Sequence, residues 1–232
     1  MNAIQSELRA SANPARSKVL ARFFKTGVGE YGEGDKFLGL NVPKTREIAK
    51  RFSRLSLPEI SSLLGSPVHE ERLCALLILV GQFGKSSGAE RERIAEFYWK
   101  HAKKVNNWDL VDLSAPKIAG EHLAGKSKRR LYELAKSGNV WERRISIVST
   151  YAFIQRNQFS DTLKIAAILL NDEHDLIRKA VGWMLREVGK RDQKALEQFL
   201  QKHYKRMPRT MLRYAIERFP EGKRKRYLAG TA

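Results

Sequence analysis

Apolar residues recur every three to four positions along most of this chain, which is the period of an amphipathic α-helix. Five prolines stand where such a stretch begins, at positions 14, 43, 58, 67 and 208. The first turn of a helix tolerates proline, because its missing N–H has no partner there. No stretch shows sustained apolar–polar alternation with the Val, Ile and Thr content of a strand. The pattern therefore predicts an all-α protein.

The predicted helices are joined by short loops and one long loop. Their ranges are 2–11, 14–25, 43–54, 57–64, 67–84, 88–103, 106–122, 127–136, 139–156, 159–170, 173–190, 192–205 and 208–218. The long loop is the glycine-rich segment 27–40, whose role the sequence does not indicate. We expect residues 1–220 to form a single domain and the basic residues 221–232 to form a flexible tail.

Four of the longer helices suggest an internal repeat. Arg72, Trp108, Arg144 and Lys179 fall in register in them, at separations of 36, 36 and 35 residues. Each of these helices follows a shorter one. Paired helices with a period in the thirties predict an α-solenoid of HEAT-like repeats, in which equivalent helices stack side by side and line a curved inner face. The alternative is a helical bundle without repeats.

The charge of the chain points to a polyanionic partner. Lys and Arg number 44 against 25 Asp and Glu, for a net charge of +19 and a pI near 10.2. Such a balance is typical of proteins that bind nucleic acid or an anionic membrane surface. No apolar run reaches the roughly 18 residues that span a bilayer, and the first residues lack the apolar stretch of a signal peptide.

The chain offers no motif for a metal, a cofactor or a nucleophilic cysteine. The histidines are scattered, and neither zinc-finger spacing nor a phosphate-binding GxxxxGK[ST] motif is present. The one cysteine, Cys74, lies in the apolar segment "RLCALLILV", so we interpret it as a small core residue. A single cysteine suits a reducing compartment, and we expect a cytoplasmic protein without cofactor or metal.

The segment "NNWDLVDLSAP" at 106–116 carries the first candidate chemistry. Trp108 and Asp112 are four residues apart and therefore share one face of a helix, as do Lys179 and Trp183. Taken singly, each Trp could be a core residue. Asp109, near a helix start, fits a structural or capping role. The repeat register nevertheless places Trp108, Asp112, Arg144, Lys179 and Trp183 on corresponding faces, where they could form a site.

Cations that recur near helix ends could follow a phosphate backbone. The candidates for contacts to the backbone of a nucleic acid are Lys179, Arg143, Arg186, Arg209 and Arg213.

The motifs "WDLVD" (108–112), "WERR" (141–144) and "RKAVGWMLRE" (178–187) together resemble the DNA alkylation repair family of HEAT-like-repeat glycosylases, the AlkD type. "ARFFK" and "FLGLNVPKTR" resemble the opening helices and turn of that family, so the similarity runs over residues 14–218. Phe23 falls where the family often has Tyr, and the glycine-rich loop is longer than the family pattern.

The resemblance implies a C-shaped, right-handed superhelix of helix pairs that holds duplex DNA in its concave face. It also implies an enzyme that excises N3- or N7-alkylated purines. Asp112 would be the catalytic carboxylate, Trp108 and Trp183 the aromatic walls, and Arg144 the basic partner. It also implies that the damaged base stays largely stacked. We expect a monomer near the nucleoid and a monofunctional enzyme, since no lysine is identifiable as a Schiff-base former. Alternatives are a non-catalytic, structure-specific DNA-binding solenoid and a protein–protein scaffold.

We predict that the affinity for duplex DNA falls steeply as salt rises, because bound cations release counterions from the phosphates. Fluorescence anisotropy with labelled duplex, between about 50 and 200 mM salt, measures the slope. Salt-independent binding, or none, would favour the scaffold alternative.

Overall fold

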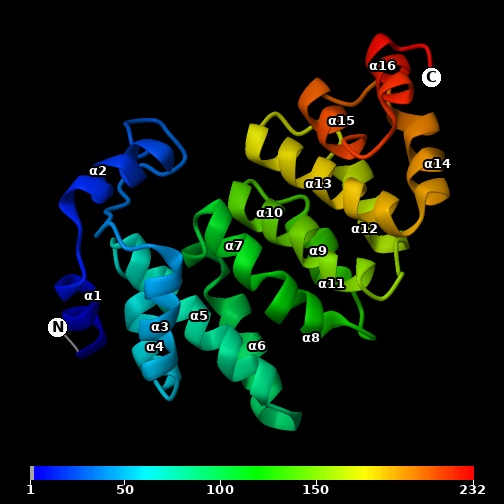
Figure 1. Cartoon of the computed structure of the whole chain (residues 1–232). Helices are drawn as coiled ribbons and strands as arrows, with labels where there is room; N and C mark the ends of the chain where they lie inside the picture. The colour runs from blue at the N-terminus through cyan, green and yellow to red at the C-terminus, as the bar shows by residue number, and fades with distance from the viewer. Residues whose placement is uncertain (1–2) are drawn as a thin grey trace. The chain divides into compact units, whose positions relative to one another are not determined.

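The computed structural model describes residues 3–232 (Figure 1). Within that range the chain forms helices joined by loops and no strand, which confirms the all-α prediction. Its contacts divide it into two compact units. The N-terminal unit ends at Ser114 and the C-terminal unit begins at Ala115. The expected helix start at residue 2 lies outside the described residues.

The N-terminal unit is built around its longest helix, α5. Its helices are α1 (Ala3–Ala10), α2 (Pro14–Phe23), α3 (Val42–Arg51), α4 (Leu57–Leu64), α5 (His69–Lys85), α6 (Gly88–Lys100), the short 3-10 helix η1 (Ala102–Lys104) and α7 (Trp108–Ser114). Helix α5 contacts α1, α3, α4, α6 and α7. Cys74 is fully buried on it beside Leu76 and Leu79, as expected of a core residue.

The predicted proline positions mark real helix starts in this unit. Pro14, Pro43 and Pro58 lie in the first turns of α2, α3 and α4. The side chains of Asn13 and Asn41 cap α2 and α3 by accepting backbone N–H groups. These caps satisfy donors that have no partner inside the helix.

The C-terminal unit is built around α13 in the same way. Its elements are the π-helical turn η2 (Pro116–Gly120), α8 (Glu121–Leu123), α9 (Arg129–Leu134), α10 (Val140–Ser149), α11 (Tyr151–Ile154), α12 (Ser160–Ile168), α13 (Asp175–Arg191), α14 (Gln193–His203), α15 (Arg209–Ala215) and α16 (Glu221–Ala229). Helix α13 contacts α10, α11, α12, α14 and α15. Residues Ile177, Val181, Leu185 and Val188 bury its apolar face.

The helix predicted over 106–122 is broken in the structure. Helix α7 ends at Ser114, and Pro116, which has no N–H to continue the ladder, opens a π-helical turn. Gly120 N donates to the carbonyl of Ala115, five residues earlier, at 2.9 Å. Asp112 therefore lies in the last turns of a short helix instead of the middle of a long one.

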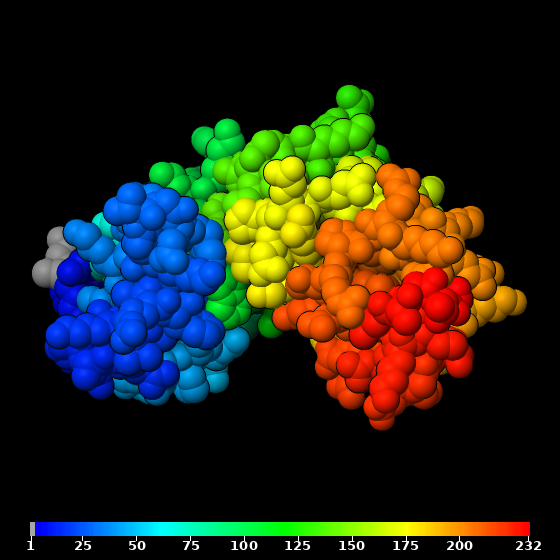
Figure 2. Space-filling model, turned by 90° about the horizontal axis from the view of Figure 1, so that it is seen from above, coloured from blue at the N-terminus to red at the C-terminus, as the bar shows by residue number. Residues whose placement is uncertain are grey.

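The basic C-terminal segment also differs from the expectation. We expected residues 221–232 to be a flexible tail, but Glu221–Ala229 form α16. Tyr227 is buried, with its ring 5.3 Å from that of Tyr204 and 5.8 Å from that of Phe219. In Figure 2 this red segment lies against the orange segments of its own unit. Burial of one aromatic side chain anchors a helix that is otherwise highly charged.

The repeat is visible in a recurring arginine contact. Arg72, Arg143 and Arg178 each donate to the backbone carbonyl six residues earlier, those of Ser66, Ser137 and Asp172, at 2.8, 2.9 and 2.7 Å. Each arginine N–H also bonds the carbonyl four residues earlier, where its helix begins. The same partly buried contact thus recurs at three helix starts.

This contact shifts the register that we inferred from the sequence. Asn107 O accepts the first helical bond of α7 from Val111, so Val111 takes the arginine position there. Asp112, the residue after Val111, is then equivalent to Arg144 and Lys179. These two residues directly follow Arg143 and Arg178, the arginines that make the recurring contact. The sequence register had placed Trp108 there, one turn too early. Because residues four apart share a face, Trp108 and Asp112 both remain on the equivalent side.

Successive helices of the repeat pack together inside each unit. Helix α5 contacts α7, and α10 contacts α13. This is the side-by-side stacking expected of helical repeats.

We predict that Gly182→Ala destabilises the C-terminal unit by about 1–3 kcal/mol, because an added methyl group overpacks the contact between α13 and α15. A Cβ there would lie 2.5 Å from both the Met211 carbonyl oxygen and the Tyr214 Cβ. Urea unfolding measures the loss. Gly222→Ala is the control, since a Cβ there meets nothing within 4 Å and alanine favours the helix. An equal loss in both variants would rule out the packing explanation.

Candidate functional site

Trp108 opens α7 inside a group of aromatic rings. Its half-buried indole stacks on Phe24, with centroids 5.3 Å apart and planes 16° from parallel. Phe23 meets the indole edge to face at 6.0 Å. Phe24 is buried, whereas Phe23 is 61% exposed. One side of the indole is thus held by a buried ring, and an exposed ring stands beside it.

Asp112 lies one turn after Trp108 on the same helix and is half-buried. Burial raises the pKa of the neighbouring Tyr98 hydroxyl, and the charge of Asp112 raises it further. The Tyr98 hydroxyl is 3.0 Å from Ser114 Oγ, which in turn donates to the Leu110 carbonyl at 2.6 Å. The Asp112 carboxylate therefore acts in surroundings where charge is only partly screened by water, which strengthens its electrostatic effect.

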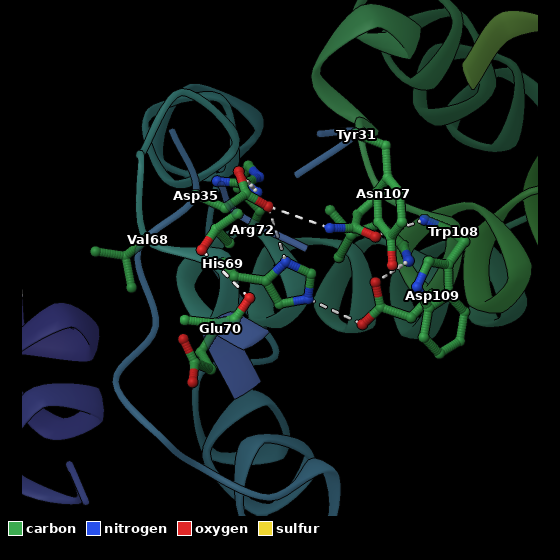
Figure 3. A network of polar contacts seen from close by, with 12 residues as sticks. Tyr31, Asp35, Val68, His69, Glu70, Arg72, Asn107, Trp108 and Asp109 are labelled. Atoms are coloured by element: carbon green, nitrogen blue, oxygen red, sulfur yellow. Dashed lines mark hydrogen bonds and ion pairs between the residues drawn. The ribbon is translucent and has the colours of Figure 1, made fainter. Parts of the chain in front are cut away.

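A polar network holds the start of α7 (Figure 3). His69, the first residue of α5, lies between two carboxylates: its Nε2 is 2.9 Å from Asp109 Oδ2, and its Nδ1 is 3.4 Å from Asp35 Oδ2. Arg72 Nη2 donates to Asp35 Oδ1 at 2.7 Å, and Asn107 Nδ2 donates to Asp35 Oδ2 at 3.2 Å. The network joins the glycine-rich loop, α5 and α7.

The network shifts the pKa values of its members. Burial alone would lower the pKa of His69, but the hydrogen bonds to Asp109 and Asp35 outweigh burial and raise that pKa to about 9. Burial alone would raise the pKa of Asp35, but the hydrogen bond from His69 and the charge of Arg72 bring that pKa below its usual value. Both shifts favour the charged forms, so the network is a set of buried ions.

The glycine-rich loop is tied to the start of α5. The Glu70 carboxylate accepts hydrogen bonds from the N–H groups of Leu38, Gly39 and Leu40 at 2.9, 2.8 and 3.2 Å. Gly39 adopts a φ of 89°, and a Cβ there would lie 2.2 Å from the Asn13 carbonyl oxygen, so only glycine fits. The loop thereby brings Asp35 and Phe37 to His69.

Sequence analysis did not identify the roles of Asp35, His69 or Asn107. Asp35 and Asn107 are 72 positions apart, and no spacing motif relates residues so distant in the chain. Asp109 was expected to be structural, and its hydrogen bond to His69 agrees with that role.

Two of the other candidates lie in the C-terminal unit. Arg144 is only 5% exposed, and its Nη1 donates to the Leu176 carbonyl at 2.6 Å, which ties α10 to the first turn of α13. Trp183 is half-buried on α13, and its Nε1 donates to Glu187 Oε1 at 3.2 Å. The structure therefore brings Arg144 and Trp183 onto two helices that pack together, as it brings Trp108 and Asp112 onto α7.

Most of the candidate cations for the DNA backbone are engaged with other groups of the chain. Arg143 bonds Asp172 and Lys179 bonds Asp175, both at 2.7 Å, while Arg186 pairs with Glu217. Arg209 donates to the Leu228 carbonyl at 3.0 Å, and Arg213 is exposed. Exposed ion pairs contribute roughly 0–1 kcal/mol. The pair of Lys179 with Asp175 is of this kind, whereas Arg143 and Asp172 are largely buried.

Other groups offer little chemistry. Burial raises the pKa of the Cys74 thiol to about 12, so it is not a thiolate near neutral pH. Among residues 3–232 no cluster of three or more His, Cys, Asp or Glu side chains could hold a metal ion. In the same range no helix has the length and apolar character needed to cross a membrane.

The described residues form an all-helical, strongly basic protein in which one helix, α7, carries a tryptophan and an aspartate one turn apart. The sequence model of DNA alkylation repair enzymes matches residues 4–219, so the chain belongs to that family. The fold is similar to that of a predicted DNA alkylation repair enzyme from Enterococcus faecalis, with a TM-score of 0.70. That similarity covers 90% of this chain and 97% of the other at 17% identity. None of the curated proteins matches this sequence.

We predict that His69 stabilises the protein in a pH-dependent way. A raised pKa gives stability that is complete below about 6.5, the unfolded value, and is lost as pH rises through about 9. With 1.36 kcal/mol per pKa unit, this contribution is on the order of 3 kcal/mol. The free-energy difference between wild type and His69→Gln, from urea unfolding at several pH values, should shrink across that range. A constant difference would contradict an ionised His69.

Proposed function

We propose that this protein is a monofunctional DNA glycosylase that hydrolyses the N-glycosidic bond of N3- or N7-alkylated purines in duplex DNA. Two observations support the proposal. The chain belongs to the DNA alkylation repair enzyme family, and α7 carries Trp108 and Asp112 one turn apart, both half-buried. The half-buried Trp108–Asp112 pair is the main support for the proposal. A partly desolvated carboxylate would only weaken the DNA affinity of a non-catalytic binding surface.

The substrate determines how much catalysis is needed. A purine alkylated at N3 or N7 bears a positive charge and is already an activated leaving group, so a strong general acid is unnecessary. Departure of the base leaves positive charge on the deoxyribose, as in glycoside hydrolysis. The group that the enzyme must supply is therefore a fixed negative charge close to the sugar.

Asp112 is the residue that we assign to this role. Its carboxylate stabilises the oxocarbenium-like sugar and orients the attacking water, whose proton it accepts. A negative charge disfavours bound DNA in the ground state but attracts the sugar in the transition state. Only such a differential interaction accelerates the chemical step.

The two tryptophans suit a cationic substrate. The faces of an indole ring attract cations, so Trp108 and Trp183 can each stabilise the alkylated base or the charged sugar. Phe24 stacks on Trp108 and fixes its plane, and the Glu187 carboxylate fixes the edge of Trp183. Rings that are held in place lose little entropy when substrate binds.

Arg144 is the basic partner in this proposal. Its hydrogen bond to the Leu176 carbonyl sets the plane of the guanidinium, and arginine recognises phosphate through fixed, directional donors. We assign contacts to the DNA backbone to the more exposed cations Lys179, Arg143, Arg186, Arg209 and Arg213.

We predict that Asp112→Asn lowers the release of 7-methylguanine from methylated duplex by at least about 100-fold, because electrostatic stabilisation of the transition state is lost. DNA binding should persist or tighten, since a repulsive charge is removed. Single-turnover base release, followed by chromatography, gives the rate, and anisotropy gives the affinity.

Glu133→Gln is the matched control, because it makes the same charge change at an exposed position on α9. It should leave base release unchanged. Release of 7-methylguanine by Asp112→Asn at the wild-type rate would contradict the proposed mechanism. If the wild-type protein binds DNA but frees no base, the chain is a non-catalytic DNA-binding member of its family.

A further inference from the structure

The geometry around His69 requires both ring nitrogens to carry a proton. A carboxylate faces Nε2 at 2.9 Å and another faces Nδ1 at 3.4 Å. Ionised carboxylates only accept hydrogen bonds, and a neutral imidazole has only one N–H. The two contacts are therefore satisfied together only when His69 is an imidazolium.

The charges in this buried group then balance. His69 and Arg72 are positive, and Asp35 and Asp109 are negative; their side chains are 2%, 3%, 6% and 18% exposed. Other groups that contact these four side chains are uncharged: the Asn107 amide bonds Asp35, the Ser66 carbonyl accepts from Arg72, and the rings of Phe24 and Phe37 lie against His69. Loss of the His69 proton leaves one uncompensated negative charge, and an unpaired buried charge is strongly destabilising.

Both carboxylate contacts lead to the first turn of α7. Asp109 belongs to that turn, and Asp35 binds Asn107, whose Oδ1 accepts the N–H of Trp108 at 2.8 Å. Trp108 thus lies between Asn107 and Asp109, whose side chains are both held by hydrogen bonds of this network.

The rings make a second connection. The His69 ring lies against Phe24 in a tilted arrangement, with centroids 4.8 Å apart, and Phe24 stacks on Trp108 at 5.3 Å. The ring of Phe24 therefore lies between the imidazole and the indole and contacts both. Asp112 follows one turn after Trp108 on the same short helix.

We propose that His69 is a positioning residue for the Trp108–Asp112 site: bridging Asp35 and Asp109, it fixes the first turn of α7 and makes base excision depend on its protonation. His69 touches no substrate; it acts through α7. The proposal rests on the glycosylase function proposed above. It gives the glycine-rich loop a role, because this loop supplies Asp35 and Phe37.

The test compares wild type, His69→Gln and His101→Gln in single-turnover base release from about pH 6.5 to pH 10, with spontaneous release subtracted. Glutamine keeps one donor and one acceptor but cannot carry the charge. His101 is the matched control: both of its ring nitrogens also make hydrogen bonds in the N-terminal unit, but to Ser61 Oγ and the Phe97 carbonyl. All rates are taken at a temperature where circular dichroism shows each variant folded.

A misplaced catalytic group costs about 10- to 100-fold, so we expect His69→Gln to be slower by that factor near neutral pH. The ratio of the wild-type rate to the His69→Gln rate should fall towards one as pH rises through about 9. His101→Gln should keep the wild-type rate and pH profile. The affinity for duplex DNA should be similar in the wild type and in both variants.

A second measurement does not depend on catalysis. In protein labelled with fluorinated tryptophan, the Trp108 signal, assigned by Trp108→Phe, is followed by fluorine NMR as pH rises. We expect it to move with the titration of the His69 ring in wild type and in His101→Gln, and to stay constant over that range in His69→Gln.

The outcomes separate the two proposals. A wild-type protein that releases no base overturns the glycosylase function, and the Trp108 signal then decides whether His69 positions α7. The positioning role is overturned if the Trp108 signal does not change while His69 titrates. It is also overturned if the His69→Gln protein has the rate and pH profile of the wild type.

Discussion

The bridge from His69 to Asp35 and Asp109 is the interaction on which the candidate site depends. It joins three segments that are far apart in the chain, and it is buried, so its hydrogen bonds must all be made at once. A buried ion group gains little stability over an apolar core but tolerates few alternative arrangements. Its value here is geometric, because it fixes where α7 begins and therefore which way Trp108 and Asp112 project.

Charge is used in two opposite ways in this protein. The surface carries an excess of cations, net charge +19, that attracts DNA over a long range. Many of the candidate contacts are held by carboxylates, as Arg143 is by Asp172. Such pairs hold long side chains in fixed positions. Asp112 opposes this attraction, and its proposed benefit comes only when the sugar becomes positive.

A recurring arginine contact marks the start of three of the repeat helices. An arginine at the start of a helix bonds the carbonyl six residues earlier, in the turn that precedes the helix, and this contact recurs at Arg72, Arg143 and Arg178. Helix α7 has Val111 at that position. The segments around Asn107 and Asp35 are held instead by the His69 network, so the one repeat helix without the arginine is the helix that carries Asp112.

The sequence by itself determined the helices and the candidate residues, because apolar periodicity, first-turn prolines and short motifs are local signals. The pairing of Trp108 with Asp112 is also local, since four residues make one helical turn. Only the tertiary structure decided the rest. Tyr227 anchors α16 by burial against Tyr204, and the end of α7 depends on Pro116 and on the close packing that follows it. The partners of His69 lie 34 and 40 positions away on separate elements, and no periodicity relates positions that meet only because the chain packs them into one core.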